Sequence, residues 1–430
     1  MDEYAMTGFR VREHRVEVPV DRADPHRFGS IEVFAREIVD PHRAGEDLPL
    51  LLFLQGGPGG MGPRPVPGGG WWATALRTHR VVLLDQRGTG RSSRVEGADV
   101  AAFDDARTAG DYLACFRADA IVEDAEHLRR TVYGGRRWTT LGQSYGGFVT
   151  LTYLSRHPEA LDACWVTGGL PPVGATARDV YAATFPRQLA RNRALHRAFP
   201  ADVELLGHLA DRVAAGGVTL PTGEPLTVER LQTLGMPLGM STGIDDLHWL
   251  LDTALDRRGE PAPGFLAEVA SRTGFAANPL YLVLQEVIYH SGPREPGWAA
   301  ADELARHASF ATGARPLALT GEAVFPWVYE QVAALRPFAA AAEDLASRTA
   351  WPALYDVDRL AANDVPVAAV QYYDDPYVDL DLALTTASGL GNAQVWITNE
   401  YLHDGLRAAG DTILPHLQDL TAGRRTVTSR

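Results

Sequence analysis

Ser144 stands in a run whose spacing is that of a catalytic nucleophile. The run from Gly142 to Gly146 reads Gly-Gln-Ser-Tyr-Gly and matches Gly-x-Ser-x-Gly. In that pattern the serine occupies a sharp turn between a strand and a helix, and its hydroxyl stands clear of the sheet. Residues 138–141 are apolar and β-prone, and residues 148–156 have helical spacing. The alternative is an ordinary strand–turn–helix, so a catalytic Ser144 requires partners elsewhere in the chain.

A serine hydroxyl is a weak nucleophile at neutral pH and needs a base, which itself needs an orienting acid. In chains with this turn the order is serine, acid, histidine. Asp374 and Asp375 follow a predicted strand, and His403 lies in a loop after the next one. The carboxyl ends of parallel strands are where sites on such sheets form. Residue chemistry does not separate Asp374 from Asp375, and His290 is a rival base within the helical part of the chain.

A glycine- and proline-rich stretch, residues 56–70, follows the continuous apolar run at residues 50–54. Glycine lets backbone N–H groups approach a ligand closely, so this stretch is interpreted as a loop that lines an oxyanion hole. A flexible turn is the alternative. The later turn that begins at Asp85 and Arg87 is interpreted as structural, with both side chains holding the loops together.

Composition excludes several classes of function. The chain has 430 residues, a formal net charge of −14 and an apolar fraction of 46%. Such an acidic chain argues against a nucleic-acid partner. Two cysteines, Cys115 and Cys164, do not make a disulfide framework, and neither a signal peptide nor an apolar run of membrane-spanning length is visible. These features predict a cytoplasmic protein without a membrane partner.

The order of elements predicts the fold class. Residues 15–168 alternate short β-prone runs with helical stretches, which is typical of an open, mostly parallel α/β sheet. Residues 1–14 are expected to be frayed. The predicted organisation is a first part of the core at 1–170, a helical, aromatic-rich cap at 171–345 and a second part of the core at 346–430. An independent helical domain is the alternative for the middle segment, and a helix at about 404–420 is expected to close the fold.

The motifs together resemble the proline iminopeptidases, the prolyl aminopeptidases of the α/β-hydrolase superfamily, over nearly the whole chain. The motifs that carry the resemblance are Gln55-Gly56-Gly57-Pro58-Gly59, Asp85-Gln86-Arg87-Gly88-Thr89-Gly90, Gly142-Gln143-Ser144-Tyr145-Gly146-Gly147 and the pairing of Asp375 with His403. Phe116-Arg117-Ala118-Asp119 and Leu319-Thr320-Gly321-Glu322 are similar to the larger members. The chain departs from the smaller members at Gln55, where they have histidine. The resemblance implies an α/β-hydrolase fold with a large helical cap insertion.

The resemblance also implies roles for single residues. The family's aspartate lies about one helix and one strand before the histidine, which favours Asp375 over Asp374. The implied oxyanion donors are the N–H of Tyr145 and that of Gly56 or Gly57. The family binds the substrate's α-amino group through cap glutamates, for which the candidates are Glu286, on an otherwise apolar helix, and then Glu322. The cap aromatics expected to wall a pocket for a proline ring are Tyr289, Phe325 and Trp327.

The expected activity is that of a serine aminopeptidase that releases N-terminal proline from short peptides through Ser144, His403 and Asp375. This chemistry requires no metal and no cofactor. The first alternative is an esterase, lactonase or amidase that acts on a small molecule with the same triad, because a fold does not determine a substrate. The second is a non-catalytic binding protein on the same fold.

Overall fold

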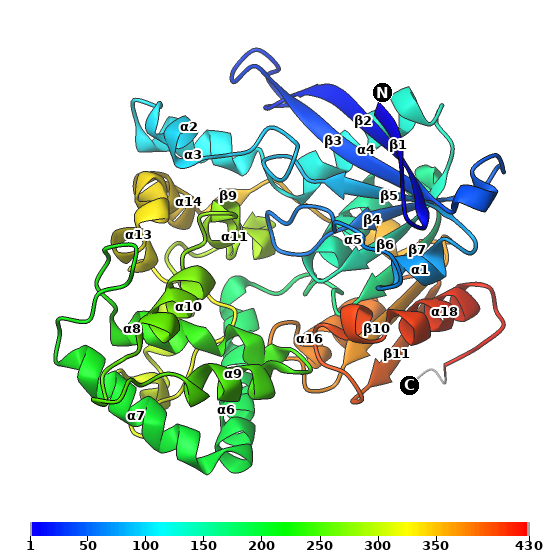
Figure 1. Ribbon diagram of the computed structural model, residues 1–430. Helices are drawn as coiled ribbons and strands as arrows, with labels where there is room; N and C mark the ends of the chain where they lie inside the picture. Colours follow the sequence, from blue (N-terminus) through cyan, green and yellow to red (C-terminus); the bar gives the residue numbers. More distant parts are fainter. Residues whose placement is uncertain (1, 428–430) are drawn as a thin grey trace.

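A nine-stranded sheet with helices on both faces organises the computed structural model, which describes residues 2–427 (Figure 1). The strand order is β1-β2-β3-β5-β4-β6-β7-β10-β11. The strands are β1 (Asp2–Met6), β2 (Phe9–Pro19), β3 (Ser30–Val39), β4 (Leu50–Leu54), β5 (Arg80–Asp85), β6 (Trp138–Gln143), β7 (Leu161–Thr167), β10 (Val367–Tyr372) and β11 (Ala393–Thr398). In this spatial order, every neighbouring pair from β5 onward is parallel, whereas the pairs β1–β2, β2–β3 and β3–β5 are antiparallel. The predicted mostly parallel sheet is confirmed.

Strand β4 explains why its sequence is continuously apolar. Its five residues are all buried, and alternate side chains point to opposite faces of the sheet. One set, which includes Leu52, packs with helices α4 (Ala118–Val132) and α5 (Tyr145–Arg156). The other set, which includes Phe53, packs with α1 (Trp72–Ala75) and α18 (Gly410–Thr421). The strand is therefore buried on both faces, as parallel strands between helices are.

Both ends of the chain differ from the sequence-based prediction. The expectation of a frayed segment at residues 1–14 is wrong, because β1 and β2 form an antiparallel hairpin there. Phe9 and Val11 are buried in the core beside Ile38, and this burial holds the segment on the sheet. The closing helix is interrupted at Ala409 and becomes α17 (Gly405–Ala408) followed by α18.

Between β7 and β10, which are neighbours in the sheet, the chain makes a long and mainly helical excursion. Its longer helices lie at the left of Figure 1, away from the sheet. Its elements are α6 (Ala177–Ala198), α7 (Pro200–Ala214), α8 (Val228–Gln232), η3 (Thr233–Gly239), α9 (Gly243–Asp252), α10 (Pro263–Thr273), α11 (Pro279–Leu284), η4 (Val287–Tyr289), β8 (Gly292–Pro293), α12 (Ala299–Leu304), η5 (Ala308–Phe310), α13 (Val328–Gln331), η6 (Ala333–Phe338), α14 (Ala339–Ser347), β9 (Ala350–Trp351) and α15 (Val357–Ala361). The predicted helical character of this segment is confirmed.

An apolar cluster shared by both parts attaches the helical excursion to the sheet domain. The helix pair α2 (Gly97–Ala101) and α3 (Ala106–Ala114) extends from the sheet domain and meets α14 and η6. Leu113 of α3 and Leu345 of α14 are both fully buried in the shared cluster. The remaining elements are η1 (Pro41–Arg43), η2 (Pro158–Ala160) and α16 (Leu380–Ser388). No helix within residues 2–427 combines the length and the apolar character that crossing a membrane requires.

Candidate active site

Ser144 occupies the turn between β6 and α5, as its sequence motif predicts. Its backbone lies in the left-handed region with φ 55°, which is unusual for a residue with a side chain. The glycine at position 146 makes this turn possible, because a Cβ there would lie 1.9 Å from the Leu54 carbonyl oxygen. Strand β4 and helix α5 therefore approach each other closely beside the turn that carries Ser144.

The structure brings Ser144, His403 and Asp375 together in one hydrogen-bonded line. His403 Nε2 lies 2.8 Å from Ser144 Oγ, and His403 Nδ1 lies 2.8 Å from Asp375 Oδ2. The second Asp375 oxygen accepts the N–H groups of Tyr377 and Val378 at 2.8 and 3.1 Å. Asp375 is buried, whereas Asp374 is exposed, so the structure separates the two acids that residue chemistry left equivalent.

The electrostatics of His403 suit a base that accepts a proton. Burial alone would lower the pKa of the imidazole, because a charged ring loses its hydration. The Asp375 carboxylate more than offsets that effect, and the pKa of His403 is raised above its usual value of 6.5. An imidazolium formed at His403 is therefore stabilised by the acid that also orients the ring.

The loop after β4 lies directly against the nucleophile. A Cβ on Gly56 would come within 2.9 Å of Ser144 Cβ, so only glycine allows this approach. Gly57 lines the same cavity as Ser144. The N–H of Tyr145 opens helix α5, where the first N–H groups have no acceptor within the helix. Three candidate oxyanion donors thus belong to two segments that meet at Ser144.

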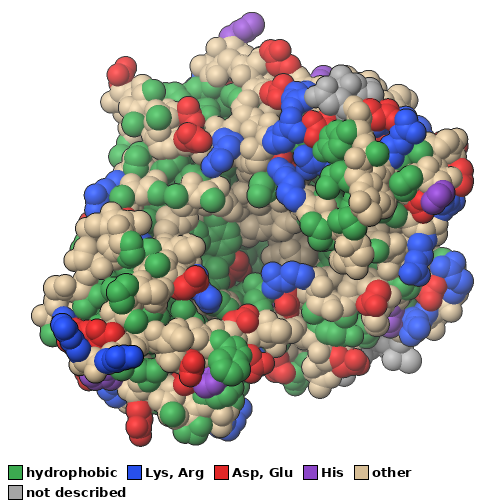
Figure 2. All heavy atoms as spheres, in the orientation of Figure 1, with side chains coloured by type: hydrophobic (Ala, Val, Ile, Leu, Met, Phe, Trp, Pro, Cys, Tyr) green, Lys and Arg blue, Asp and Glu red, His purple; other side chains and the backbone are tan. Residues whose placement is uncertain are grey.

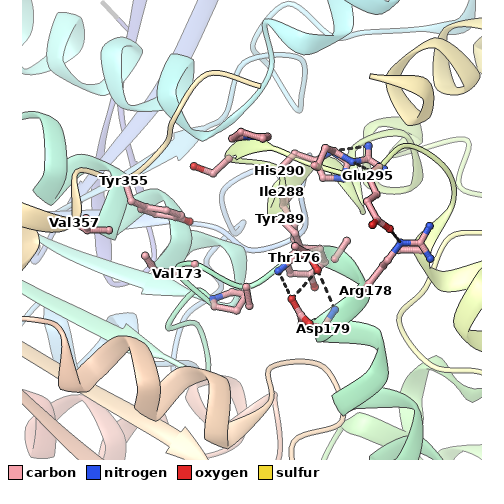
Figure 3. A pocket seen from close by; sticks show the side chains of 18 residues that line it. Val173, Thr176, Arg178, Asp179, Ile288, Tyr289, His290, Glu295, Tyr355 and Val357 are labelled. Carbon is pink, nitrogen blue, oxygen red and sulfur yellow. Dashed lines mark hydrogen bonds and ion pairs between the residues drawn. The ribbon is translucent and has the colours of Figure 1, made fainter. Parts of the chain in front are cut away.

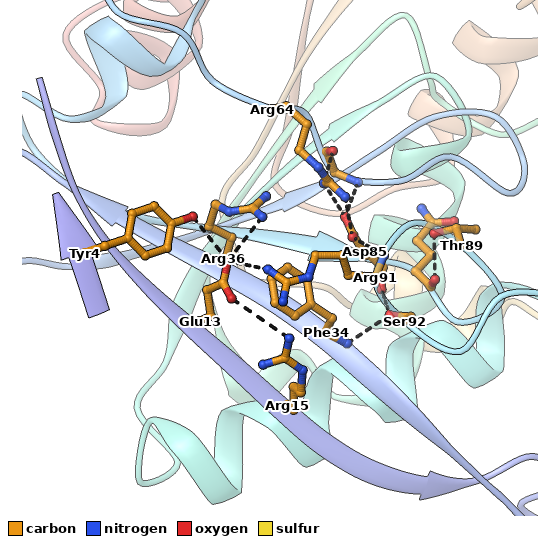
Figure 4. Close-up of polar contacts among 12 residues, drawn as sticks. Tyr4, Glu13, Arg15, Phe34, Arg36, Arg64, Asp85, Thr89, Arg91 and Ser92 are labelled. Carbon is orange, nitrogen blue, oxygen red and sulfur yellow. Dashed lines mark hydrogen bonds and ion pairs between the residues drawn. The ribbon is translucent and has the colours of Figure 1, made fainter. Parts of the chain in front are cut away.

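Asp85 anchors that loop from beneath, and Figure 4 shows it between Arg64 and the turn at Ser92. Its carboxylate accepts the N–H of Gly62 at 2.9 Å and that of Arg91 at 2.8 Å. The Arg64 guanidinium adds two hydrogen bonds of 2.7 Å, one to each carboxylate oxygen. The structural interpretation of the turn after β5 is confirmed, and Arg87 acts likewise in a buried pair with Asp124.

Ser144 faces a cavity of about 450 Å³ between the sheet domain and the helical segment that links β7 to β10. Figure 2 shows the drawn face hollowed between these two parts, with apolar side chains inside the hollow. Several elements line it, from the loop after β4 to η3 and α17. Its lining includes Phe53, Gly57, Trp71, Trp72, Ser144, Met236, Met240, Tyr281, Glu322, Tyr377, His403, Asp404 and Arg407. A small substrate with an apolar body fits such walls.

The two glutamates expected to bind the substrate's amino group lie in different places. Glu322 lines the Ser144 cavity, and the Tyr281 hydroxyl donates to its carboxylate at 2.6 Å. Burial raises the pKa of Glu322, while nearby His403 acts in the opposite direction. The structure does not bring Glu286 to this cavity. Its carboxylate instead accepts the N–H groups of Ala299 and Ala300, at 3.0 and 2.9 Å, and so begins helix α12.

The three aromatic residues expected to wall the Ser144 cavity lie elsewhere. Phe325 and Trp327 stack on each other with ring centroids 6.1 Å apart. Tyr289 packs edge-on against Tyr181 and lines a different cavity. In the described part of the chain, none of the three belongs to the lining around Ser144.

The aromatic and sulfur side chains that do line the Ser144 cavity were missed by sequence reasoning. Trp71 and Trp72 end the glycine-rich loop, and Tyr377 follows Asp375 by two residues. Because these residues are close in sequence to the candidate oxyanion loop and to Asp375, they could have been predicted to lie near the site. Met236 and Met240 come from the distant segment η3, and nothing in their local pattern indicates the site.

A mostly parallel sheet with a serine at the turn before α5 defines the class of α/β hydrolases, and the sequence model for the α/β hydrolase fold matches residues 49–204. The chain is 42% identical to a proline iminopeptidase from Aeromonas sobria over 96% of its own length and 97% of the relative's. It is 33% identical to a proline iminopeptidase from Aspergillus aculeatus, with 96% and 94% of the two chains covered. The chain belongs to the proline iminopeptidase family.

Solved structures give a weaker match. A crystal structure of a proline iminopeptidase from Mycobacterium smegmatis aligns with a TM-score of 0.43 and 15% identity, covering 96% of this chain and 100% of the other.

Proposed function

We propose that the protein is a serine aminopeptidase that releases N-terminal proline from short peptides. The observation that carries this proposal is a shared cavity, in which Ser144 and His403 stand with the cap carboxylate of Glu322. A nucleophile with its base can cleave an amide, and a carboxylate in the same cavity can receive the ammonium of a free N-terminus. Membership of the proline iminopeptidase family supports the choice of proline.

The reaction follows from the geometry at Ser144. His403 Nε2 takes the hydroxyl proton as Ser144 Oγ attacks the prolyl carbonyl carbon. The N–H of Tyr145 and that of Gly56 or Gly57 hold the negative oxygen of the tetrahedral intermediate. When the amide bond breaks, His403 returns the proton to the leaving amine and an acyl-enzyme remains. Water, deprotonated by His403, then attacks the ester and releases proline.

Glu322 supplies the selectivity for a free amine in this proposal. An ammonium that leaves water for a half-buried cavity needs an opposing charge, and Glu322 is the cap carboxylate beside Ser144. An acylated proline nitrogen has no positive charge to offer and adds bulk at the same place. The role proposed for residues 171–345 is that of a cap, because they contribute Glu322, Tyr281 and the two methionines to a site whose nucleophile belongs to the sheet domain.

A cytoplasmic location belongs to the proposal. Cys115 and Cys164 both carry free thiols, which suits a reducing compartment.

The test is a comparison of free and N-acetylated proline p-nitroanilides with wild type and Ser144→Ala. Wild type should hydrolyse the free amide and react with a fluorophosphonate probe, and Ser144→Ala should do neither. Ser388→Ala, which changes an exposed serine on α16, is the matched control and should behave as wild type. Equal turnover of the free and blocked amides would favour the alternative, a small-molecule esterase, lactonase or amidase.

A further inference from the structure

A second and larger cavity, of about 670 Å³, lies at the N-terminal end of helix α6. Its walls come from residues 172–179, from most of residues 288–295 and from Tyr355 and Val357 near the start of α15. Figure 3 shows Tyr355 and Val357 on one side of it and Ile288, Tyr289 and His290 on the other. In the described part of the chain, no residue lines both this cavity and the one at Ser144. The mechanism above makes no use of it.

Arg294 is a charged residue of this second cavity that has no carboxylate partner at ion-pair distance among residues 2–427. Its guanidinium is half-buried and donates to the carbonyl oxygens of Glu295 and Gly297, at 2.8 and 2.9 Å. A further N–H lies 3.4 Å from Nδ1 of His290. Within residues 2–427 no carboxylate approaches Arg294 to ion-pair distance. A guanidinium has five N–H donors, so two remain for a ligand.

Arg294 therefore holds a positive charge that its neighbours do not neutralise. Burial lowers the pKa of Arg294, and Glu286 offsets this only at longer range. His290 contributes no charge of its own, because burial, helped by the Arg294 and Arg117 cations, lowers the pKa of its imidazole well below the usual value and keeps the ring neutral. A half-buried cation in this position is stabilised by an anion that enters the cavity.

The other charged groups in the lining already have partners. The Asp179 carboxylate caps helix α6 by accepting the N–H and the hydroxyl of Thr176, at 2.8 and 2.7 Å. Glu295 pairs with Arg178, whose guanidinium also lies 2.6 Å from Asp302. Figure 3 shows both the capped end of α6 and the pair of Arg178 with Glu295. The charge available to a ligand is thus that of Arg294.

The remaining walls are suited to an apolar body. Val173, Ile288 and the ring of Tyr355 line the cavity together with Pro172 and Pro293. Such walls favour a ligand with a small hydrocarbon frame over a strongly hydrated ion such as phosphate. A carboxylate attached to a compact apolar group satisfies both the walls and the guanidinium.

A small void lies between this cavity and the Ser144 cavity. Its lining includes Pro172, Tyr289 and Tyr377 together with Phe148 and Asp379. Pro172 and Tyr289 also line the Arg294 cavity, and Tyr377 also lines the Ser144 cavity. The Arg294 cavity is therefore adjacent to the place where the reaction creates a new carboxylate.

We propose that the Arg294 cavity binds a small carboxylate with an apolar body, and that the amino acid released at Ser144 is one such ligand. The carboxylate accepts the free N–H groups of Arg294, and the ring packs among Val173, Ile288 and Tyr355. The identity of the released amino acid rests on the proposed function, whereas the carboxylate site does not.

The test is calorimetric titration of protein whose Ser144 has been blocked with a fluorophosphonate, the adduct being checked by intact mass. L-Proline and cyclopentanecarboxylate should each bind with a stoichiometry near one. L-Prolinamide, which lacks the carboxylate, should bind at least about tenfold more weakly, as expected for loss of a charged hydrogen bond. Failure of labelling would count against the proposed function alone, and the titration would then be run on unlabelled protein.

Arg294→Gln should weaken binding of both carboxylates by about ten- to a hundredfold. Arg272→Gln, at an exposed arginine on α10, is the matched control and should bind as wild type. Val173→Trp leaves Arg294 unchanged but fills the cavity, and should also abolish binding, which covers the case in which Arg294→Gln does not fold. Binding of cyclopentanecarboxylate alone would support the site and place its ligand outside the reaction. Binding that prolinamide shares equally, or that both cavity variants retain, would overturn the proposal.

Discussion

Replacement of Glu322 by glutamine should separate recognition of the amine from hydrolysis. Glutamine has nearly the size of glutamate and can still accept the Tyr281 hydroxyl, which now donates to Glu322 at 2.6 Å. It has no charge to offer an ammonium. The hydrogen bonds at Ser144, His403 and Asp375 involve no atom of residue 322, so the catalytic groups should remain in place.

The size of the effect follows from the interaction that is lost. A hydrogen bond to a charged group contributes about 1.5–3 kcal/mol. Since about 1.4 kcal/mol corresponds to a factor of ten, kcat/KM for proline p-nitroanilide should fall about ten- to a hundredfold. Turnover of p-nitrophenyl acetate, which has no amine, should fall much less, because residue 322 makes no hydrogen bond to Ser144, His403 or Asp375.

Glu286→Gln is the matched comparison, because it removes the other cap carboxylate that the sequence indicated. Its side chain faces Ala299 and Ala300 and not the Ser144 cavity, so the preference for a free amine should persist. Steady-state kinetics on free and N-acetylated proline p-nitroanilides measure both variants. The reasoning is refuted if Glu322→Gln keeps the preference, or if Glu286→Gln loses it while remaining folded.

Three further outcomes are expected. The acid limb of the kcat/KM profile should reflect protonation of His403, and its midpoint should lie above the usual imidazole pKa because Asp375 raises the pKa of His403. Asp375→Asn should move this limb to lower pH, and a limb that does not move would contradict the assignment of Asp375. Burial raises the pKa of Glu286 to about 7 from 4.5, so the stability it contributes is complete below pH 4.5 and lost as pH rises through 7. Urea unfolding should show a loss of about 3 kcal/mol across that range, and Glu286→Gln should flatten it. Asp85→Ala removes the acceptor of Arg64 and of two backbone N–H groups. The free energy of unfolding should fall by about 2 kcal/mol, a figure reduced to allow for the partial exposure of Arg64, and the melting temperature should fall with it. Asp47→Ala at an exposed acid is its control, and equal melting temperatures would count against Asp85 as the anchor.

Many helices and strands could be predicted from local sequence patterns, because the forces that form these elements act between residues close in sequence. Strand β4 coincides with the continuous apolar run at residues 50–54, which suits a strand buried on both faces. Helix α4 spans residues 118–132, where apolar side chains recur at the 3.6-residue spacing that suits a helix. The hairpin at residues 2–19 was missed because its stability comes from burial of Phe9 and Val11 beside Ile38, which belongs to another strand. The charged side chains that alternate with them, Arg10 and Arg12, hid that contact.

The sequence by itself identified Ser144, because the strand–turn–helix that exposes a nucleophile needs small residues at set positions. The order and spacing of Asp375 and His403 behind it also follow from the sequence. Only the tertiary structure decided which acids and aromatics share a space with Ser144. Glu286 and Glu322 look alike in sequence, yet one begins a helix and the other faces the nucleophile. Trp71, Met236 and Tyr377 meet from three distant segments. The walls of a cavity depend on how whole helices pack, and no local pattern records that packing.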